Sequence, residues 1–104
     1  MSRLRLSAEA RDDLRDIRQY CLDQGGPGLS IYIRGELLKQ VAFLAANPGA
    51  GHSREDLTPL PVKFWPVFSY LIVYDPKLKP IGIARIVQGN RDLRALFERS
   101  PPKA

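Results

Sequence analysis

Cysteine is almost absent from this chain, since Cys21 is the only one among 104 residues. A single cysteine cannot form an intramolecular disulfide, and it cannot build a cysteine-based zinc cluster. Histidine is equally scarce: His52 stands alone in a polar loop, with no neighbour suited to share a proton. A lone histidine of this kind is more often a surface residue than a catalytic base.

Long hydrophobic segments are also missing. No apolar run approaches the roughly 20 residues that a transmembrane helix needs. Residues 1–7 lack the apolar core of a signal peptide. We therefore expect a cytoplasmic protein without membrane contact.

The usual cofactor motifs do not occur. The sequence has no Walker-type phosphate loop, no glycine-rich dinucleotide fingerprint and no Ser–His–Asp pattern. Asp12, Asp13 and Asp16 crowd one stretch, but arginines at positions 11, 15 and 18 neutralise them. Such a mixed charge run is typical of a solvated helical face. We expect neither a cofactor nor a metal site.

Basic residues outnumber acidic ones. Sixteen Lys and Arg against 11 Asp and Glu give a formal net charge of +5. This balance favours acidic partners, either nucleic acid or an acidic protein segment. Charge that serves only solubility is the alternative, because net charge alone is weak evidence of a partner.

The hydrophobic pattern predicts one α+β domain over residues 1–104, with element order β-α-α-β-β-β-α. Glycines and a proline at 25–28 separate two amphipathic helices, and residues 75–80 resemble a hairpin turn. Residues 99–104 are expected to fray. The expected strands are 3–6, 62–65, 68–74 and 81–87, and the expected helices are 8–23, 29–46 and 92–99.

The C-terminal third carries the most specific pattern. The apolar strand from Tyr70 is followed by a turn and by a second strand that Arg85 interrupts, and then by Gln88-Gly-Asn-Arg91-Asp92 before a short helix. This order resembles the C-terminal signature of the RelE/ParE superfamily of bacterial toxins, in particular its ParE-like plasmid-stabilisation branch. Segments 10–20 and 44–51 are similar to the same family, so the resemblance covers nearly the whole chain.

The resemblance implies an antiparallel sheet packed by a helical hairpin, with a short C-terminal helix. It also implies the toxin of a type II toxin–antitoxin module, which binds DNA gyrase until a cognate antitoxin neutralises it. Operator DNA would be contacted only through the antitoxin. The residues expected to bind the target are Arg85, Arg91, Arg94 and Arg99.

The antitoxin is expected to cover the groove between the helical hairpin and the sheet. An exposed sheet edge would accept an added strand from it. The apolar residues expected to bind the antitoxin are Leu29, Ile33, Leu37, Val67 and Tyr70.

Two departures from the family bear on mechanism. Gln88 stands where ParE-like members commonly have histidine, and Phe97 lies near the position of a tyrosine in the RelE-like endoribonucleases. Neither side chain can transfer a proton near neutral pH, although metal-free RNA cleavage requires proton transfer. The departures favour a non-enzymatic toxin, and no catalytic residue is assigned.

Two alternatives stay open. The first is a ribosome-dependent mRNA endoribonuclease. Its phosphate contacts would include Arg54 and Lys63, and its proton transfer would fall to His52, Tyr74 or Lys63. The second is a non-toxic remnant that only binds the antitoxin.

Overall fold

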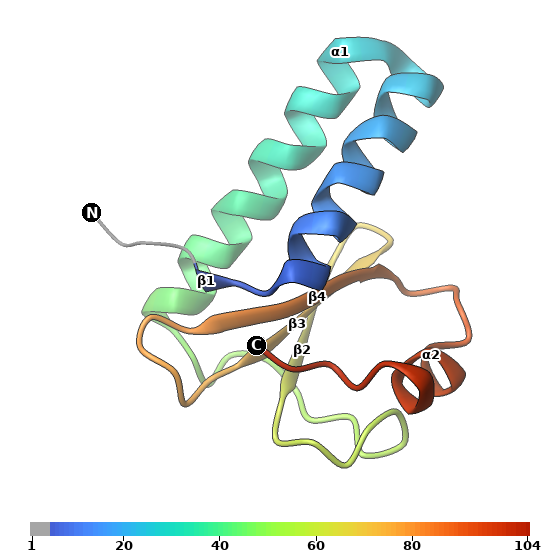
Figure 1. The fold of residues 1–104 in the computed structure, drawn as a ribbon. Helices are drawn as coiled ribbons and strands as arrows, with labels where there is room; N and C mark the ends of the chain where they lie inside the picture. The colour runs from blue at the N-terminus through green and yellow to red at the C-terminus, as the bar shows by residue number, and fades with distance from the viewer. Residues whose placement is uncertain (1–4) are drawn as a thin grey trace.

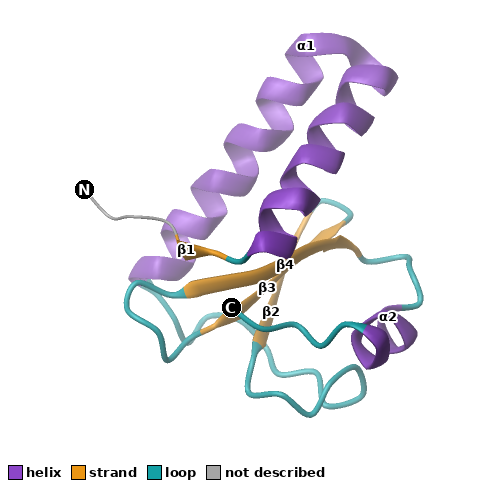
Figure 2. Cartoon of the chain, viewed as in Figure 1, coloured by secondary structure: helices purple, strands orange, loops and turns teal. Residues whose placement is uncertain are grey.

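A computed structural model describes residues 5–104 as an α+β fold. The expected strand at 3–6 is present at its described end, and positions 3 and 4 lie outside the described residues. Figures 1 and 2 show a helical hairpin standing on one face of the sheet, with a short helix near the other. In chain order the elements are β1 (Arg5–Leu6), α1 (Ala8–Ala46), β2 (Lys63–Val67), β3 (Tyr70–Asp75), β4 (Gly82–Gln88) and α2 (Leu93–Arg99).

Both arms of the hairpin belong to α1. The chain breaks at Gly26, where φ is 79° and ψ is −172°, a conformation that favours glycine. Pro27 follows at the start of the second arm, where its missing N–H costs nothing. Ser7 caps the first arm, because its hydroxyl accepts a bond from the N–H of Ala10 at 3.0 Å. The turn is thus tighter than the sequence predicts, and the arms extend further into residues 25–28.

The sheet has the order β1-β4-β3-β2. Strands β2, β3 and β4 pair antiparallel, as predicted, whereas β1 pairs parallel with β4. A parallel neighbour needs a crossover connection, and the rest of the chain up to β4 supplies it. Strand β2 runs on through Pro66 and Val67, which lie between the two expected strands 62–65 and 68–74. Pro66 is tolerated because β2 is an edge strand.

The sheet is covered on both faces. The helical hairpin packs on one face through residues such as Ile17, Leu37 and Leu44, against Ile72 and Ile83 of the sheet. On the other face, α2 and the loop before β2 cover a second cluster that includes Val73, Ala84 and Phe97. The tail after α2 is not frayed as expected, because Pro102 is fully buried.

Candidate target-binding and partner-binding surfaces

Arg85 is committed to an ion pair inside the fold. Its Nε and Nη2 donate to the two carboxylate oxygens of Asp13 at 2.7 and 2.9 Å, and each side chain is only 11% exposed. The backbone N–H of Ile86 donates to the same carboxylate at 2.9 Å. The hydrogen bond to Asp13 raises the pKa of Arg85, and burial opposes it. Arg85 therefore fastens α1 to β4, and it is not available on the surface where we expected it.

The other three predicted target-binding arginines are exposed around α2. Arg91 lies in the turn before the helix, which Asp92 caps by accepting a bond from the N–H of Ala95 at 3.2 Å. Arg94 lies 3.5 Å from Glu98, one turn further on, in an exposed pair. Arg99 ends the helix, where a positive charge complements the dipole. Arg91 and Arg99 have no salt-bridge partner within residues 5–104, and Arg94 is held only by its exposed pair with Glu98.

Arg91 also borders a small cleft of about 290 Å³ between the first arm of α1 and the end of β4. Gln88, Tyr70, Tyr20 and Asp16 lie on its walls. Burial raises the pKa of the Tyr70 hydroxyl above its usual 10.0, Cys21 adds to that rise, and Gln88 opposes it. The hydroxyl is therefore protonated at neutral pH, so the cleft offers a donor rather than a base.

The groups left for RNA cleavage are held in structural roles. The hydroxyl of Tyr74 donates to the carbonyl of Pro48 at 2.8 Å and accepts from the N–H of Gly51 at 2.9 Å. Burial raises the pKa of Tyr74, and the bond from Gly51 opposes the rise. Phe97 is buried, with its ring centre 5.9 Å from that of Phe64. Both rings are buried.

Of the predicted phosphate-contacting residues, Arg54 is paired with a carboxylate and Lys63 is partly buried. Arg54 donates two bonds to Asp56 at 3.0 and 2.8 Å, and these bonds lower the pKa of Asp56. Lys63 is half-buried at the start of β2. The side chain of His52 is exposed, while its backbone pairs with Phe64. Arg54 and Arg85 thus form separate ion pairs with different partners.

The predicted antitoxin-binding residues divide into two groups. Leu37 is fully buried, and Val67 and Tyr70 keep less than a tenth of their surface. These three side chains belong to the core, and of the three only Tyr70 also lines the cleft beside Arg91. Leu29 is exposed and Ile33 is half-buried. Both lie on the second arm of α1, where the apolar periodicity that predicted them marks the inward face of the helix.

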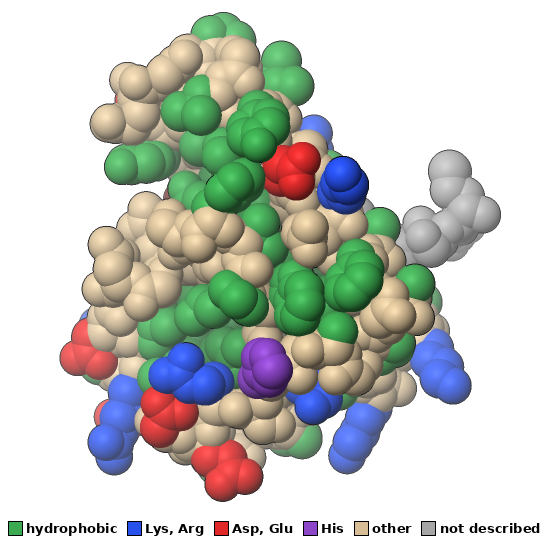
Figure 3. Space-filling view, turned by 180° about the vertical axis from the view of Figure 1, so that it is seen from behind, with side chains coloured by type: hydrophobic (Ala, Val, Ile, Leu, Met, Phe, Trp, Pro, Cys, Tyr) green, Lys and Arg blue, Asp and Glu red, His purple; other side chains and the backbone are tan. Residues whose placement is uncertain are grey.

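Aromatic side chains supply the apolar surface that we had assigned to these core residues. Tyr32 and Phe68 are 57% and 56% exposed, with ring centres 6.0 Å apart. Phe43 stacks on Trp65 at 5.5 Å, and the indole N–H of Trp65 donates to Gln40 at 2.9 Å. We call Tyr32, Phe43, Trp65 and Phe68 the aromatic face; Figure 3 shows hydrophobic side chains gathered over this side of the molecule.

Phe68 is held in an unfavourable backbone conformation. It is the first of two residues between β2 and β3, and its φ is 54°. Two-residue hairpin turns with a positive φ at this position favour glycine, and the left-handed region costs other residues about 1–2 kcal/mol. Phe68 is therefore a candidate for a contact outside the chain, in addition to its contact with Tyr32.

Within residues 5–104, backbone donors are interrupted along the edge strand β2 and along the side of β4 that the two-residue β1 covers only in part. On β2, Phe64 exchanges both backbone bonds with His52, and Pro66 has no N–H. On β4, Ser7 donates from its backbone N–H to Ile83 and from its hydroxyl to the carbonyl of Ala84. A partner strand therefore finds no uninterrupted row of backbone donors along β2.

Residues 5–104 contain no group of three His, Cys, Asp or Glu side chains placed to hold a metal ion. No helix in this range is long and apolar enough to cross a membrane.

Comparisons with known proteins agree with the fold. A family model described as the ParE toxin of type II toxin–antitoxin system, parDE, matches residues 4–93. A solved structure described as the chromosomal ParDE TA system from P. aeruginosa is 27% identical, with a TM-score of 0.70. The match covers 85% of this chain and 96% of that one. A comparison with curated proteins gives no match.

Proposed function

Because the chain belongs to the ParE toxin family of type II toxin–antitoxin systems, we propose that it inhibits DNA gyrase by binding it. A cognate antitoxin neutralises it, and both act in the cytoplasm. The observation that carries this proposal is the family match across residues 4–93, with the matching fold. Gyrase is the target that the family resemblance implies.

The target-binding surface in this proposal consists of Arg91, Arg94 and Arg99. All three are exposed around α2, and Arg91 lines the adjoining cleft. Exposed guanidinium groups speed association with an acidic surface and set its orientation more than they add affinity. Binding of this kind needs no proton transfer, which fits the structural roles of Tyr74 and Phe97.

The antitoxin-binding surface in this proposal is the aromatic face. Large aromatic side chains lose little conformational entropy on binding and commonly dominate interface energies. Leu29, three residues before Tyr32 on the same arm, is also exposed. Operator DNA is contacted through the antitoxin.

A supercoiling assay tests the target. Purified protein should inhibit gyrase, and the Arg91→Glu/Arg94→Glu variant should inhibit at least about tenfold less. The matched control is Lys77→Glu/Lys79→Glu, which changes the charge equally in the turn between β3 and β4. Normal supercoiling together with cleaved transcripts in a translation extract would replace this proposal with the endoribonuclease.

A binding assay tests the antitoxin. The protein encoded by the neighbouring reading frame should restore supercoiling, and co-expression should raise the yield. Tyr32→Ser/Phe68→Ser should weaken that complex without loss of fold, since both side chains are more than half exposed. Equal affinity of parent and variant would exclude the aromatic face.

A further inference from the structure

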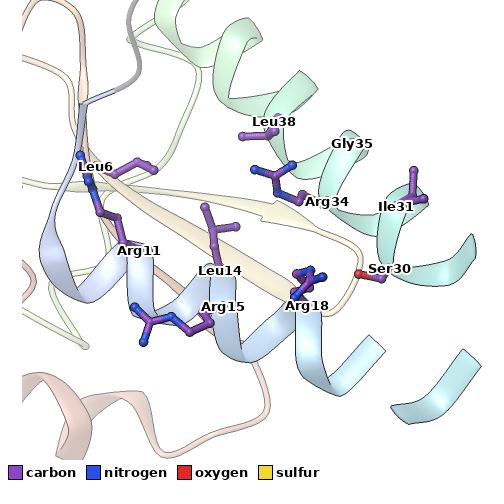
Figure 4. A pocket seen from close by; sticks show the side chains of 10 residues that line it. All are labelled: Leu6, Arg11, Leu14, Arg15, Arg18, Ser30, Ile31, Arg34, Gly35 and Leu38. Carbon is purple, nitrogen blue, oxygen red and sulfur yellow. The ribbon is translucent and has the colours of Figure 1, made fainter. Parts of the chain in front are cut away.

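Two hollows of this molecule differ in the charges that line them. The larger, of about 770 Å³, lies between the two arms of α1, and Figure 4 shows arginines from both arms around it. No acidic side chain lines it. The smaller is the cleft of about 290 Å³ between the first arm and the end of β4, where Asp16 and Arg91 bring one charge of each sign. The cleft therefore suits a different class of ligand.

The walls of the cleft come from one helix face and from two paired strands. Asp13, Asp16 and Tyr20 are three and then four residues apart, so they lie on one face of the first arm of α1. Tyr70 pairs with Gln88 across β3 and β4, and both residues also line the cleft. The buried ion pair of Asp13 fastens this arm to β4. The walls are therefore held in place before any ligand binds.

The two charges at the cleft are unpaired. Within residues 5–104, neither Asp16 nor Arg91 has a salt-bridge partner, and they do not pair with each other. An anionic ligand would be attracted to Arg91 but repelled by Asp16, and a cationic ligand would meet the reverse problem. A neutral ligand with hydrogen-bond donors on one edge and acceptors on another satisfies both groups.

The cleft also offers an aromatic surface and a fixed donor. Tyr20 is 52% exposed, so its ring is available to cover a flat ligand. Tyr70 is almost fully buried, and its protonated hydroxyl is a donor. The volume lies near the lower end of the range for small-ligand sites, which is enough for a single heterocyclic base. These features together fit a flat, neutral heterocycle with one donor edge and one acceptor edge.

We propose that this cleft binds an unpaired guanine base. Guanine has adjacent N–H donors at N1 and N2, which match the two oxygens of the Asp16 carboxylate. Its O6 and N7 are acceptors, and the guanidinium of Arg91 contacts such a pair with two N–H groups. The ring stacks on Tyr20. Adenine is excluded by its acceptor at N1, which would point a lone pair at the carboxylate.

This site is separate from the aromatic face and from the groove between the arms of α1. It shares Arg91 with the proposed target-binding surface, but guanine binding is measured without gyrase. The proposal therefore goes beyond the proposed function and does not depend on gyrase inhibition.

Three nucleotides test the recognition of the base. Guanosine, inosine and adenosine monophosphates carry the same phosphate, and inosine differs from guanosine only by lacking the 2-amino group. Amide shifts of the labelled full-length protein should report binding of the guanosine nucleotide at Tyr20, Tyr70 and Gln88–Arg91. The other two nucleotides should bind at least about fivefold more weakly. Equal affinities, or shifts confined to α2, would show that only the phosphate is recognised and would overturn the proposal.

Short single strands distinguish the two sources of the base. A thymidine pentamer with a central guanine is compared with the same pentamer carrying a central adenine. Tighter binding of the guanine strand than of guanosine monophosphate would identify a nucleic acid strand as the source, whereas tighter binding of the monophosphate would identify a free nucleotide. Equal affinities of the two strands would contradict guanine recognition.

Variants locate the contacts, and all of them replace exposed side chains. Asp16→Asn should weaken the guanosine nucleotide at least about fivefold, whereas Asp12→Asn, on the same arm but outside the cleft, should not. Arg91→Lys keeps the charge but loses the two-pronged contact, so it should weaken binding more than Arg94→Lys does. Tyr20→Phe should bind as the parent does, and Tyr20→Ser should bind more weakly. Unchanged affinity in Asp16→Asn would overturn the proposal.

Discussion

Replacing Asp13 by asparagine is expected to be among the most destabilising single changes of a charged residue in this chain. Its carboxylate holds three donors: two from the guanidinium of Arg85 and the backbone N–H of Ile86. The asparagine can still accept from the backbone, but Arg85 keeps its charge in a site that is only 11% exposed. The first arm of α1 then loses its ionic attachment to β4.

The magnitude follows from the burial. Removing one partner of a buried ion pair costs about 3–5 kcal/mol. Because each side chain retains some contact with water, we take the lower end, about 3 kcal/mol. At about 4 °C per kcal/mol for a domain of this size, the melting midpoint should fall by about 12 °C.

Urea unfolding and thermal melting measure the change. Asp12→Asn is the matched control, because Asp12 pairs with Arg15 in an exposed salt bridge and such bridges contribute little. Asp13→Asn/Arg85→Met should be at least about 1 kcal/mol more stable than Asp13→Asn, since it removes the unpaired charge. Equal stability of the Asp12 and Asp13 variants would refute the reasoning.

Three further changes test the packing and the turn by chemical unfolding. Gly35→Ala should raise the unfolding free energy by about 0.5–1 kcal/mol, since alanine favours a helix and its Cβ meets open space; a decrease would show a hidden contact. Tyr74→Phe should lower it by about 1–3 kcal/mol by leaving the N–H of Gly51 without its partner. The raised pKa values of Tyr70 and Tyr74 mean that the folded state holds these protons more tightly than the unfolded state does. Their contribution to the unfolding free energy is therefore complete below pH 10 and is lost as pH rises through the raised pKa values. Tyr74→Phe should reduce this loss at high pH, and an unchanged loss would contradict the assignment. Phe68→Gly should stay within about 1 kcal/mol of the parent, since relief of the left-handed backbone offsets the entropy of glycine, yet lose antitoxin affinity; intact affinity would show that Phe68 makes no contact.

The sequence was sufficient to predict the helices and strands, because each of them depends on local signals. Periodic apolar residues predicted both arms of α1, and turn residues around 25–28 predicted the reversal. The family signature in the last strand was likewise a linear pattern, and the family match confirmed it. These features need no knowledge of distant contacts.

The roles of single residues were harder to predict because they depend on contacts between distant segments. Asp13 and Arg85 are 72 positions apart. From the sequence, the paired carboxylate of Asp13 could therefore not be distinguished from the solvated charges beside it in the same mixed run. A second periodic pattern could have indicated the aromatic face from the sequence. Tyr32 and Phe43 are three helical turns apart, on a face beside the core stripe. The conformation of Phe68 had no sequence signal, because phenylalanine is not typical of that turn position.

The interrupted backbone donors along β2 and β4 limit how the proposed antitoxin can dock. A strand added beside β2 needs outward N–H groups, but the N–H of Val62 bonds to Leu60, that of Phe64 bonds to His52, and Pro66 has none. Along β4, Ser7 and Asp13 take the carbonyl of Ile83 and the N–H of Ile86. Backbone pairing therefore has no continuous template at these edges. The exposed side chains of the aromatic face remain, so affinity for the antitoxin should respond to Tyr32 and Phe68 far more than to any change on the outer edge of β2.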